Sequence, residues 1–289
     1  MRRLVAIPAI VLIGVLMGCT AGPATVLEQL VESRRLAADL QVQFTKATDA
    51  ANRSVMADTD EASIAFAREA EQSIVAVERN RDALKALLTS LGYGVESRLL
   101  EEFDRAFAEY RQLDRSILEL AVQNTNLKAQ RLSFGQAQQV ADAFRDALHA
   151  VASRSQADQW HVRALVATAV AGVREIQALQ GPHIAEADDA AMAKLEARMI
   201  AAESTVRQAL NELAPLVKPE SRSTLVAATS ALNQFETVHA QILDLSHRNS
   251  NVRSLALSLG RKRQLTAACE ESLHALQDAL AKRGFEATR

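Results

Sequence analysis

The sequence is poor in the residues that make turns, strands and disulfides. Its 289 residues include only 10 glycines, 5 prolines, 2 tyrosines, 1 tryptophan and 2 cysteines, although about half of the chain is apolar. Loops favour glycine and proline, and strands favour aromatic and β-branched side chains, so these shortages argue against a sheet with many turns. Alanine, leucine, glutamate, glutamine and arginine dominate instead, and these residues favour helices. The composition therefore predicts an all-α protein of long helices.

An excess of one charge is also missing. The 33 basic and 35 acidic residues give a formal net charge of −2 and are spread along the chain. Without a basic tract we expect no nucleic-acid partner. The sequence also has no glycine-rich phosphate loop, no His-Glu-x-x-His, no Cys-x-x-Cys-His and no nucleophile elbow. We therefore expect a protein that is not an enzyme and carries no cofactor.

The first residues have the pattern of an export signal. Residues 1–3 are Met-Arg-Arg, and the apolar run 4–17 is too short to span a bilayer comfortably and contains Pro8. The run ends in Leu-Met-Gly-Cys at 16–19, which resembles a bacterial lipobox. The alternatives are an ordinary signal peptide with a chance cysteine, or an uncleaved anchor. We interpret residues 1–18 as a lipoprotein signal peptide.

The lipobox resemblance implies how the protein is held in the cell envelope. It implies cleavage before Cys19, with diacylglyceryl and N-acyl (palmitate-type) chains on that residue. Each buried methylene of such chains contributes about 0.8 kcal/mol to membrane binding. Residues 19–25 read as a lipidated tether facing the periplasm. Thr20 stands where an aspartate favours inner-membrane retention, so the outer membrane is preferred.

Cys269 is the only cysteine that would remain in the mature chain, so we expect no internal disulfide. The residue 125 positions earlier is the apolar Phe144, and we therefore predict that the Cys269 thiol is buried. Trp160, the only tryptophan, is predicted to lie in a core or at a joint between two modules.

Several helix boundaries are legible in the sequence. A capping box at 25–28 predicts the start of the first helix, and the acidic stretch 58–61 predicts a break. Gly92 and Gly94 predict an end, and a third helix is expected from near Glu96 with no proline before position 182. Further boundaries are predicted by Gly181-Pro182 and by Pro219 in the first turn of the last helix.

The chain contains two related stretches, QNTNLKAQRLSFG at 123–135 and RNSNVRSLALSLG at 248–260. A shift of 125 aligns them and extends the match on both sides. We therefore predict two tandem antiparallel long-helix bundle modules, residues 26–153 and 154–285, related by an internal repeat of about 125 residues. Ser133-Phe134-Gly135 and Ser258-Leu259-Gly260 predict sites where a helix bends or allows close backbone approach.

Each stretch carries an asparagine on an apolar heptad seam and a second asparagine two positions later. One interpretation is that the seam amides fix helix register and partner choice. The other is that buried amides and nearby cations line a polar pocket that binds a ligand. The candidate ligand-binding residues are Asn124, Asn126, Lys128, Arg131, Asn249, Asn251 and Arg253.

A metal centre is a weaker alternative. Glu236-x-x-His239 and Glu271-x-x-His274 resemble the ligand pairs of di-metal carboxylate bundles, because i and i+3 share a helix face. If residues 220–284 form one helix, however, the two pairs stand about 50 Å apart and cannot share an ion. We see no helix breaker at the turn near 252–254 that would bring them together.

An asparagine-containing spacer, then Leu-Ser-x-Gly, then a long Gln/Ala/Leu helix resembles the extracytoplasmic sensor domains of methyl-accepting chemotaxis receptors. The closest likeness is to their four-helix-bundle and double-module helical-bundle forms, over roughly residues 26–285. The resemblance implies stacked antiparallel bundles that bind small solutes and tend to form homodimers. The second apolar span and the cytoplasmic hairpin of those receptors have no counterpart here, so signalling would need a membrane partner.

These observations lead to a functional expectation and one main alternative. We expect a lipid-anchored envelope protein that binds a small solute and acts through a membrane partner in signal transduction. The alternative is a structural or scaffolding lipoprotein that contacts another envelope protein.

Overall fold

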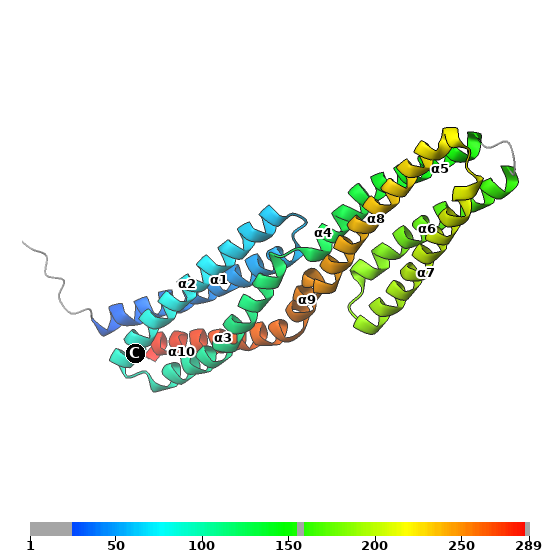
Figure 1. Ribbon diagram of the computed structural model, residues 1–289. Helices are drawn as coiled ribbons and strands as arrows, with labels where there is room; N and C mark the ends of the chain where they lie inside the picture. Colours follow the sequence, from blue (N-terminus) through cyan, green and yellow to red (C-terminus); the bar gives the residue numbers. More distant parts are fainter. Residues whose placement is uncertain (1–24, 155–158, 287–289) are drawn as a thin grey trace, which may run out of the picture.

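The computed structural model describes residues 25–154 and 159–286, with side chains up to residue 283, and every regular element in these ranges is helical. Six long helices pack antiparallel in an elongated molecule (Figure 1). The all-α prediction is therefore confirmed for the described chain. None of its helices is long and apolar enough to cross a membrane.

Four of the six rods form two helical hairpins: α1 (Val26–Met56) with α2 (Asp60–Leu91), and α6 (Gln159–Ala185) with α7 (Asp189–Leu213). The other two rods are interrupted. One consists of α3 (Gly94–Ala121), α4 (Thr125–Leu132), a π-helical turn (Ser133–Ala137) and α5 (Gln138–Arg154). The other consists of α8 (Arg222–Arg248), α9 (Ser250–Leu257), a π-helical turn (Ser258–Lys262) and α10 (Arg263–Glu286), preceded by 3-10 turns at Ala214–Leu216 and Pro219–Ser221.

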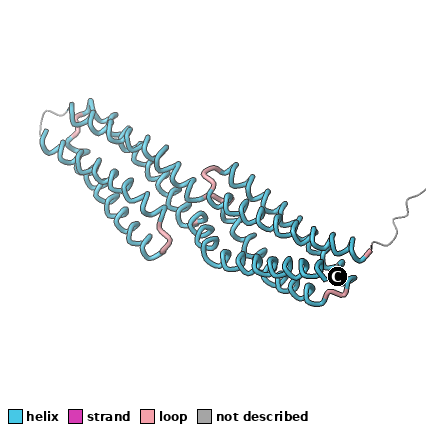
Figure 2. The backbone as a smooth tube through the Cα atoms, turned by 180° about the vertical axis from the view of Figure 1, so that it is seen from behind, coloured by secondary structure: helices cyan, strands magenta, loops and turns pink. Residues whose placement is uncertain are grey.

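The rods assemble into two four-helix groups joined end to end, as Figures 1 and 2 show from opposite sides. Bundle 1 consists of α1, α2, α3 and α10, and bundle 2 consists of α5, α6, α7 and α8. Each has its own apolar core. In the core of bundle 1 the ring of Phe44 contacts the rings of Phe103, Phe107 and Tyr110. The segments α4 and α9 cross between the bundles.

Each bundle takes helices from both halves of the sequence. The start of α1 lies beside the end of α10, where Arg34 Nη2 donates to the Ala281 carbonyl at 3.3 Å. Both ends of the described chain therefore lie at the far end of bundle 1 (Figure 1). The predicted modules 26–153 and 154–285 are defined by the internal repeat, whereas each packed bundle contains helices from both of these ranges. The division of the sequence into two repeats therefore stays a prediction.

Three helix boundaries follow the local sequence as predicted. Thr25 caps α1, with Thr25 Oγ1 accepting from the Glu28 N–H and Glu28 accepting from the Thr25 N–H. Thr59 caps α2 within the predicted break at 58–61. Gly92 ends α2 with φ +66°, a left-handed conformation that favours glycine.

Three other expectations are corrected. The helix from near Glu96 begins at Gly94 and is interrupted after Ala121. The break expected at Gly181-Pro182 lies after Ala185, because Pro182 in the last turns of α6 removes one backbone donor without stopping the helix. Trp160 lies neither in a core nor at a joint: 76% of its surface is exposed at the start of α6.

Candidate functional site

Two asparagines interrupt the long rods where the bundles join. Asn124 precedes α4 and Asn249 precedes α9, and both have positive φ, 50° and 52°. Asparagine tolerates this left-handed conformation better than other non-glycine residues. Each asparagine therefore ends one helical segment and lets the next begin in a new direction. The sequence interpretation of a continuous seam was wrong at this point.

The first turns of α4 and α9 cap each other. Asn126 N–H donates to Asn251 Oδ1 at 3.1 Å, and Asn251 N–H donates to Asn126 Oδ1 at 3.1 Å. In the same way, Thr125 N–H donates to Ser250 Oγ at 3.1 Å and Ser250 N–H donates to Thr125 Oγ1 at 3.0 Å. Backbone donors that a helix start leaves without partners are thus satisfied by the other helix. Every pair joins residues 125 positions apart.

The four asparagine side chains also bind one another, and three of them are almost completely buried. The further contacts are Asn126 Nδ2 to Asn249 Oδ1 at 2.8 Å and to the Ile184 carbonyl at 2.6 Å, Asn251 Nδ2 to Asn124 Oδ1 at 2.9 Å, and Asn249 Nδ2 to the Glu186 carbonyl at 2.7 Å. Most donors and acceptors of these side-chain amides are therefore already engaged in hydrogen bonds within the protein. This geometry favours the register interpretation of the asparagines, and their ligand-binding role stays a prediction.

The nearby cations face away from the amides. Lys128 Nζ donates to the Gln123 carbonyl at 2.8 Å and lies 3.7 Å from Asp60 Oδ2, while Arg131 Nη2 donates to the Asp58 carbonyl at 2.9 Å. Arg253 is exposed on α9. Lys128 and Arg131 thus hold the loop between α1 and α2 against the junction.

The two Glu-x-x-His pairs belong to different bundles. In bundle 2, Glu236 pairs with Arg207 at 2.6 Å and His239 contacts Gln180 at 3.2 Å. In bundle 1, His274 contacts Gln41 at 3.2 Å. Neither pair belongs to a group of potential metal ligands among the described residues. The described structure therefore does not bring the two pairs together, because α8 and α10 lie in different bundles.

One group that sequence reasoning missed consists of His183 on α6, Glu196 on α7 and His247 on α8. Both imidazoles approach the same oxygen, Glu196 Oε1, at 2.8 and 3.0 Å. No spacing rule finds such a group, because each residue comes from a different helix and only the packing of bundle 2 brings them together.

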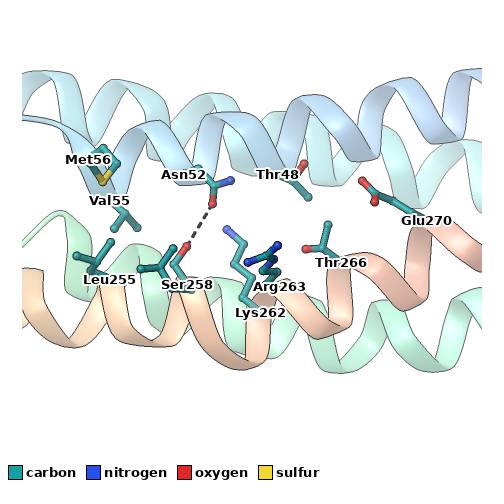
Figure 3. Close-up of a pocket in the computed structure, with 11 residues that line it drawn as sticks. Thr48, Asn52, Val55, Met56, Leu255, Ser258, Lys262, Arg263, Thr266 and Glu270 are labelled. Carbon is teal, nitrogen blue, oxygen red and sulfur yellow. Dashed lines mark hydrogen bonds between the residues drawn. The ribbon is translucent and has the colours of Figure 1, made fainter.

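A cavity of about 470 Å³ opens between α1 and the segments α9 and α10 in bundle 1 (Figure 3). Lys262 and Arg263 point across it toward α1, where Asn52 accepts a hydrogen bond from Ser258 Oγ at 3.2 Å. The remaining wall is mixed polar and apolar and consists of Thr48, Val55, Met56, Leu255, Leu259, Thr266 and Glu270. The cavity thus places two cations, one carboxylate and several hydroxyl and amide groups within one space.

The π-helical turn places the Lys262 side chain in the core. As predicted, Ser258-Leu259-Gly260 distorts the helix, and Gly260 has the non-helical angles φ −91° and ψ −108°. Lys262 is 2% exposed, and its Nζ lies 2.7 Å from Asp114 Oδ1 and 5.7 Å from the ring centre of Tyr110. Single π-helical turns are frequent at functional sites.

This buried group of Lys262, Asp114 and Tyr110 is electrostatically unusual. Burial raises the pKa of Asp114, although Lys262 acts in the opposite direction, and burial raises the pKa of Tyr110 well above its ordinary value. Lys262 Nζ, Asp114 Oδ1 and Tyr110 Oη make no hydrogen bond of good geometry with other described groups. The ammonium therefore has Asp114 as its only close charged partner among the described groups.

Of the predictions for the two cysteines, the structure confirms the one for Cys269 and does not describe Cys19. Cys269 is buried as predicted, and burial raises the pKa of its thiol to about 12. Cys19 and the rest of the proposed signal peptide and tether up to residue 24 lie outside the described residues.

Comparisons with protein-family models, with curated protein sequences and with solved structures found no match for this chain.

Proposed function

We propose that this protein is a non-enzymatic, lipid-anchored envelope protein that binds a small polar solute in bundle 1. The cavity beside Lys262 is the observation that carries this proposal. A buried ion pair seldom stabilises a fold more than apolar residues of similar volume would. Its position next to a cavity is better explained by a ligand than by stability.

The lining of the cavity favours a solute with a carboxylate group. Lys262 and Arg263 supply positive charge toward α1, and guanidinium groups bind carboxylates in a bidentate manner. Glu270 on the same wall would receive an ammonium or hydroxyl group of the solute. Thr48 and Asn52 add neutral hydrogen-bonding groups from the opposite helix. We therefore propose small carboxylates and amino acids as the ligand class.

The proposal includes a lipid anchor at Cys19 and an origin of the chain from two copies of one module. Lipidation at Cys19 would place bundle 1 nearest to the membrane, since the described chain begins and ends there. A membrane partner would then detect the solute-bound state of bundle 1 and carry the signal. We also propose that the chain arose from two copies of one helical module. The paired hydrogen bonds between residues 125 positions apart support that origin.

A thermal-shift screen tests solute binding. Small carboxylates, amino acids and amines are added to the purified protein, to Arg263→Gln, and to Arg253→Gln, which changes an exposed arginine outside the cavity. We expect at least one carboxylate to raise the melting temperature by about 2–4 °C for each kcal/mol of linkage. Arg263→Gln should lose this shift and Arg253→Gln should keep it. A panel without any shift would contradict the proposal.

The scaffolding alternative has support of its own. Phe134 and Leu259 are 78% and 67% exposed on the two π-helical turns, 125 positions apart. Large apolar side chains exposed on distorted turns are candidates for contact with a protein partner or a second copy of the chain. Substituting both with serine and measuring co-purified partners and the oligomeric state distinguishes the two functions. Loss of one stoichiometric partner, without any solute response in the unchanged protein, would favour scaffolding.

A further inference from the structure

The corner of bundle 2 nearest to the junction holds three potential metal ligands that the proposed function does not use. His183 lies near the end of α6, Glu196 in the second turn of α7, and His247 at the end of α8. Their donor atoms all lie within 4.8 Å of one another, and this is the one such group found among the described residues. The three ligands therefore come from three helices and converge on one point.

The geometry resembles a metal site with one position left open. His183 Nε2 and His247 Nε2 lie 2.8 and 3.0 Å from Glu196 Oε1, and the two rings are nearly perpendicular with centres 5.4 Å apart. Donor atoms around a tetrahedral zinc ion lie roughly 3.3 Å apart, from bond lengths of about 2.0–2.1 Å. A shift of a few tenths of an ångström in Glu196, whose side chain is 26% exposed, would reach that spacing.

The hydrogen bonds of His183 indicate which ring nitrogen carries its proton. Ser246 Oγ donates its single proton to the His183 carbonyl at 3.0 Å, and the same oxygen lies 2.8 Å from His183 Nδ1. Both contacts are hydrogen bonds at the same time only if the oxygen accepts from Nδ1–H. In the neutral ring, His183 Nε2 consequently presents a lone pair to the Glu196 carboxylate, and this contact is repulsive unless a cation lies between them.

Either a proton or a metal ion can supply that positive charge. The His183 side chain is completely buried. The arrangement of Ser246 is also the one found around metal ligands, whose second ring nitrogen donates to a neighbouring oxygen and so fixes the tautomer. The half-exposed His247 connects the group to solvent.

We propose that His183, Glu196 and His247 bind a divalent transition-metal ion, with zinc as the best match. Two imidazoles, one carboxylate and an open fourth position form a ligand set that zinc accepts. The ion ties α6, α7 and α8 together beside Ile184 at the end of α6 and Glu186 in the following loop, whose carbonyl groups accept hydrogen bonds from the junction asparagines. Metal binding therefore stabilises the contact between the α6–α7 hairpin and the junction.

The test uses the untagged full-length chain after removal of metals with a chelator. Calorimetric titration with Zn²⁺ should show one ion per chain, and Co²⁺ should give the visible absorption of a low-coordination site. His247→Ala, at a half-exposed position, and Glu196→Gln should each weaken Zn²⁺ binding by more than about 100-fold. Ser246→Ala should weaken it by about 10–100-fold, as expected for a residue that orients a ligand.

His274→Ala is the matched control, because His274 lies on α10 in bundle 1 and belongs to no such group. This variant should bind Zn²⁺ as the unchanged protein does. Circular dichroism establishes that each variant keeps its helices. Absence of stoichiometric binding, or binding that survives both His247→Ala and Glu196→Gln, would overturn the proposal. A proton would then bridge His183 and Glu196.

Discussion

The two bundles share one helix plan but differ in the chemistry of their cores. Bundle 1 buries an ion pair, whereas the positions 125 residues away in bundle 2 carry uncharged groups or a histidine. The matching positions are Tyr110 and Phe235, Asp114 and His239, and Lys262 and Ala137, and all six are buried. Bundle 2 therefore shows that this architecture does not need the ion pair. The difference predicts that the fold of bundle 1 can also form without its buried charges.

The hairpin ends near the junction differ in a similar way. In bundle 1, Ser54 and Ser63 bind each other's backbone carbonyls at 2.9 and 3.1 Å and hold α1 against α2. In bundle 2, the corresponding corner contains His183 and Glu196. The carbonyl groups of Ile184 at the end of α6 and of Glu186 in the following loop accept hydrogen bonds from the junction asparagines. Asn124 Nδ2, in contrast, has no hydrogen-bond partner among the described groups. The bundle 2 hairpin is thus bound by the junction asparagines, whereas the bundle 1 hairpin is bound by Lys128 and Arg131.

The largest predicted effect concerns the ion pair. Lys262→Met leaves Asp114 buried without a partner and should cost about 3–5 kcal/mol in the free energy of unfolding. Denaturant titration measures this loss. The double variant Lys262→Met/Asp114→Leu imitates the uncharged core of bundle 2 and should recover most of it. If the double variant were as unstable as the single one, the ion pair would be part of the folding requirement after all.

The next effect tests the unequal coupling of the junction. Asn126→Ala removes the hydrogen-bond partner of three groups: the Asn251 N–H, the Ile184 carbonyl on α6 and the side-chain oxygen of Asn249. An unpaired buried group costs about 1–3 kcal/mol, so we expect a loss in that range or above it. Asn251→Ala, which has no described contact with either hairpin, should cost less. Equal losses in denaturant titrations of the two variants would contradict the difference in coupling.

A backbone contact in bundle 2 gives a third prediction. A methyl group at Gly172 would lie 2.5 Å from Val206 Cγ2 and 3.1 Å from the Ala202 carbonyl oxygen. Gly172→Ala should therefore force α6 and α7 apart and cost about 1–3 kcal/mol. Gly135→Ala is the control, because no atom lies within 4 Å of its added methyl group. Thermal unfolding that ranks the two variants in the opposite order would show that the hairpin is loosely packed.

The smallest predicted effect is a difference in pH dependence. Burial lowers the pKa of His239 below its ordinary value of 6.5, although Glu203 opposes this shift. The unfolded chain then binds more protons, so the stability from neutral His239 is full above pH 6.5 and is lost as the pH falls. The slope is at most about 1.4 kcal/mol per pH unit. His239→Gln should reduce the loss of stability between pH 7.5 and 5.5.

The pKa of Asp114, 125 positions before His239, is shifted in the opposite direction, so its contribution to stability has the opposite pH dependence. Burial raises its pKa above the ordinary value of 3.8. Its contribution is therefore full below pH 3.8 and is lost as the pH rises through the folded-state pKa. For His239, the contradicting result is an unfolding free energy that depends on pH in the same way in His239→Gln and in the unchanged protein. The core of bundle 2 would then not favour neutral over protonated His239.

Local sequence signals predicted the parts of the fold that depend on neighbouring residues. The capping box at Thr25, the left-handed Gly92, the distorted turn at Ser258-Leu259-Gly260 and the buried Cys269 all follow from such signals. The helix breaks at Asn124 and Asn249 were missed because a heptad pattern continues through them. Their signal was the ability of asparagine to adopt a left-handed conformation.

The candidate sites depend on packing and were less predictable. The cavity joins α1 to α10 across more than 200 positions, and the ligands of the proposed metal site come from three helices. Lys262 was not predicted as a site residue from the sequence, and the π-helical turn places it in the core. Its one hint in the sequence was the small-residue bend immediately before it.

Hydrogen exchange with and without bound solute tests the central difference between the bundles most directly. The solute is the carboxylate that gives the largest thermal shift. We predict slower exchange in residues 48–56 of α1 and in residues 255–270 of α9, the π-helical turn and α10, with little change in the α6–α7 hairpin. Protection centred on α6 and α7, or spread equally over both bundles, would contradict the assignment of solute binding to bundle 1.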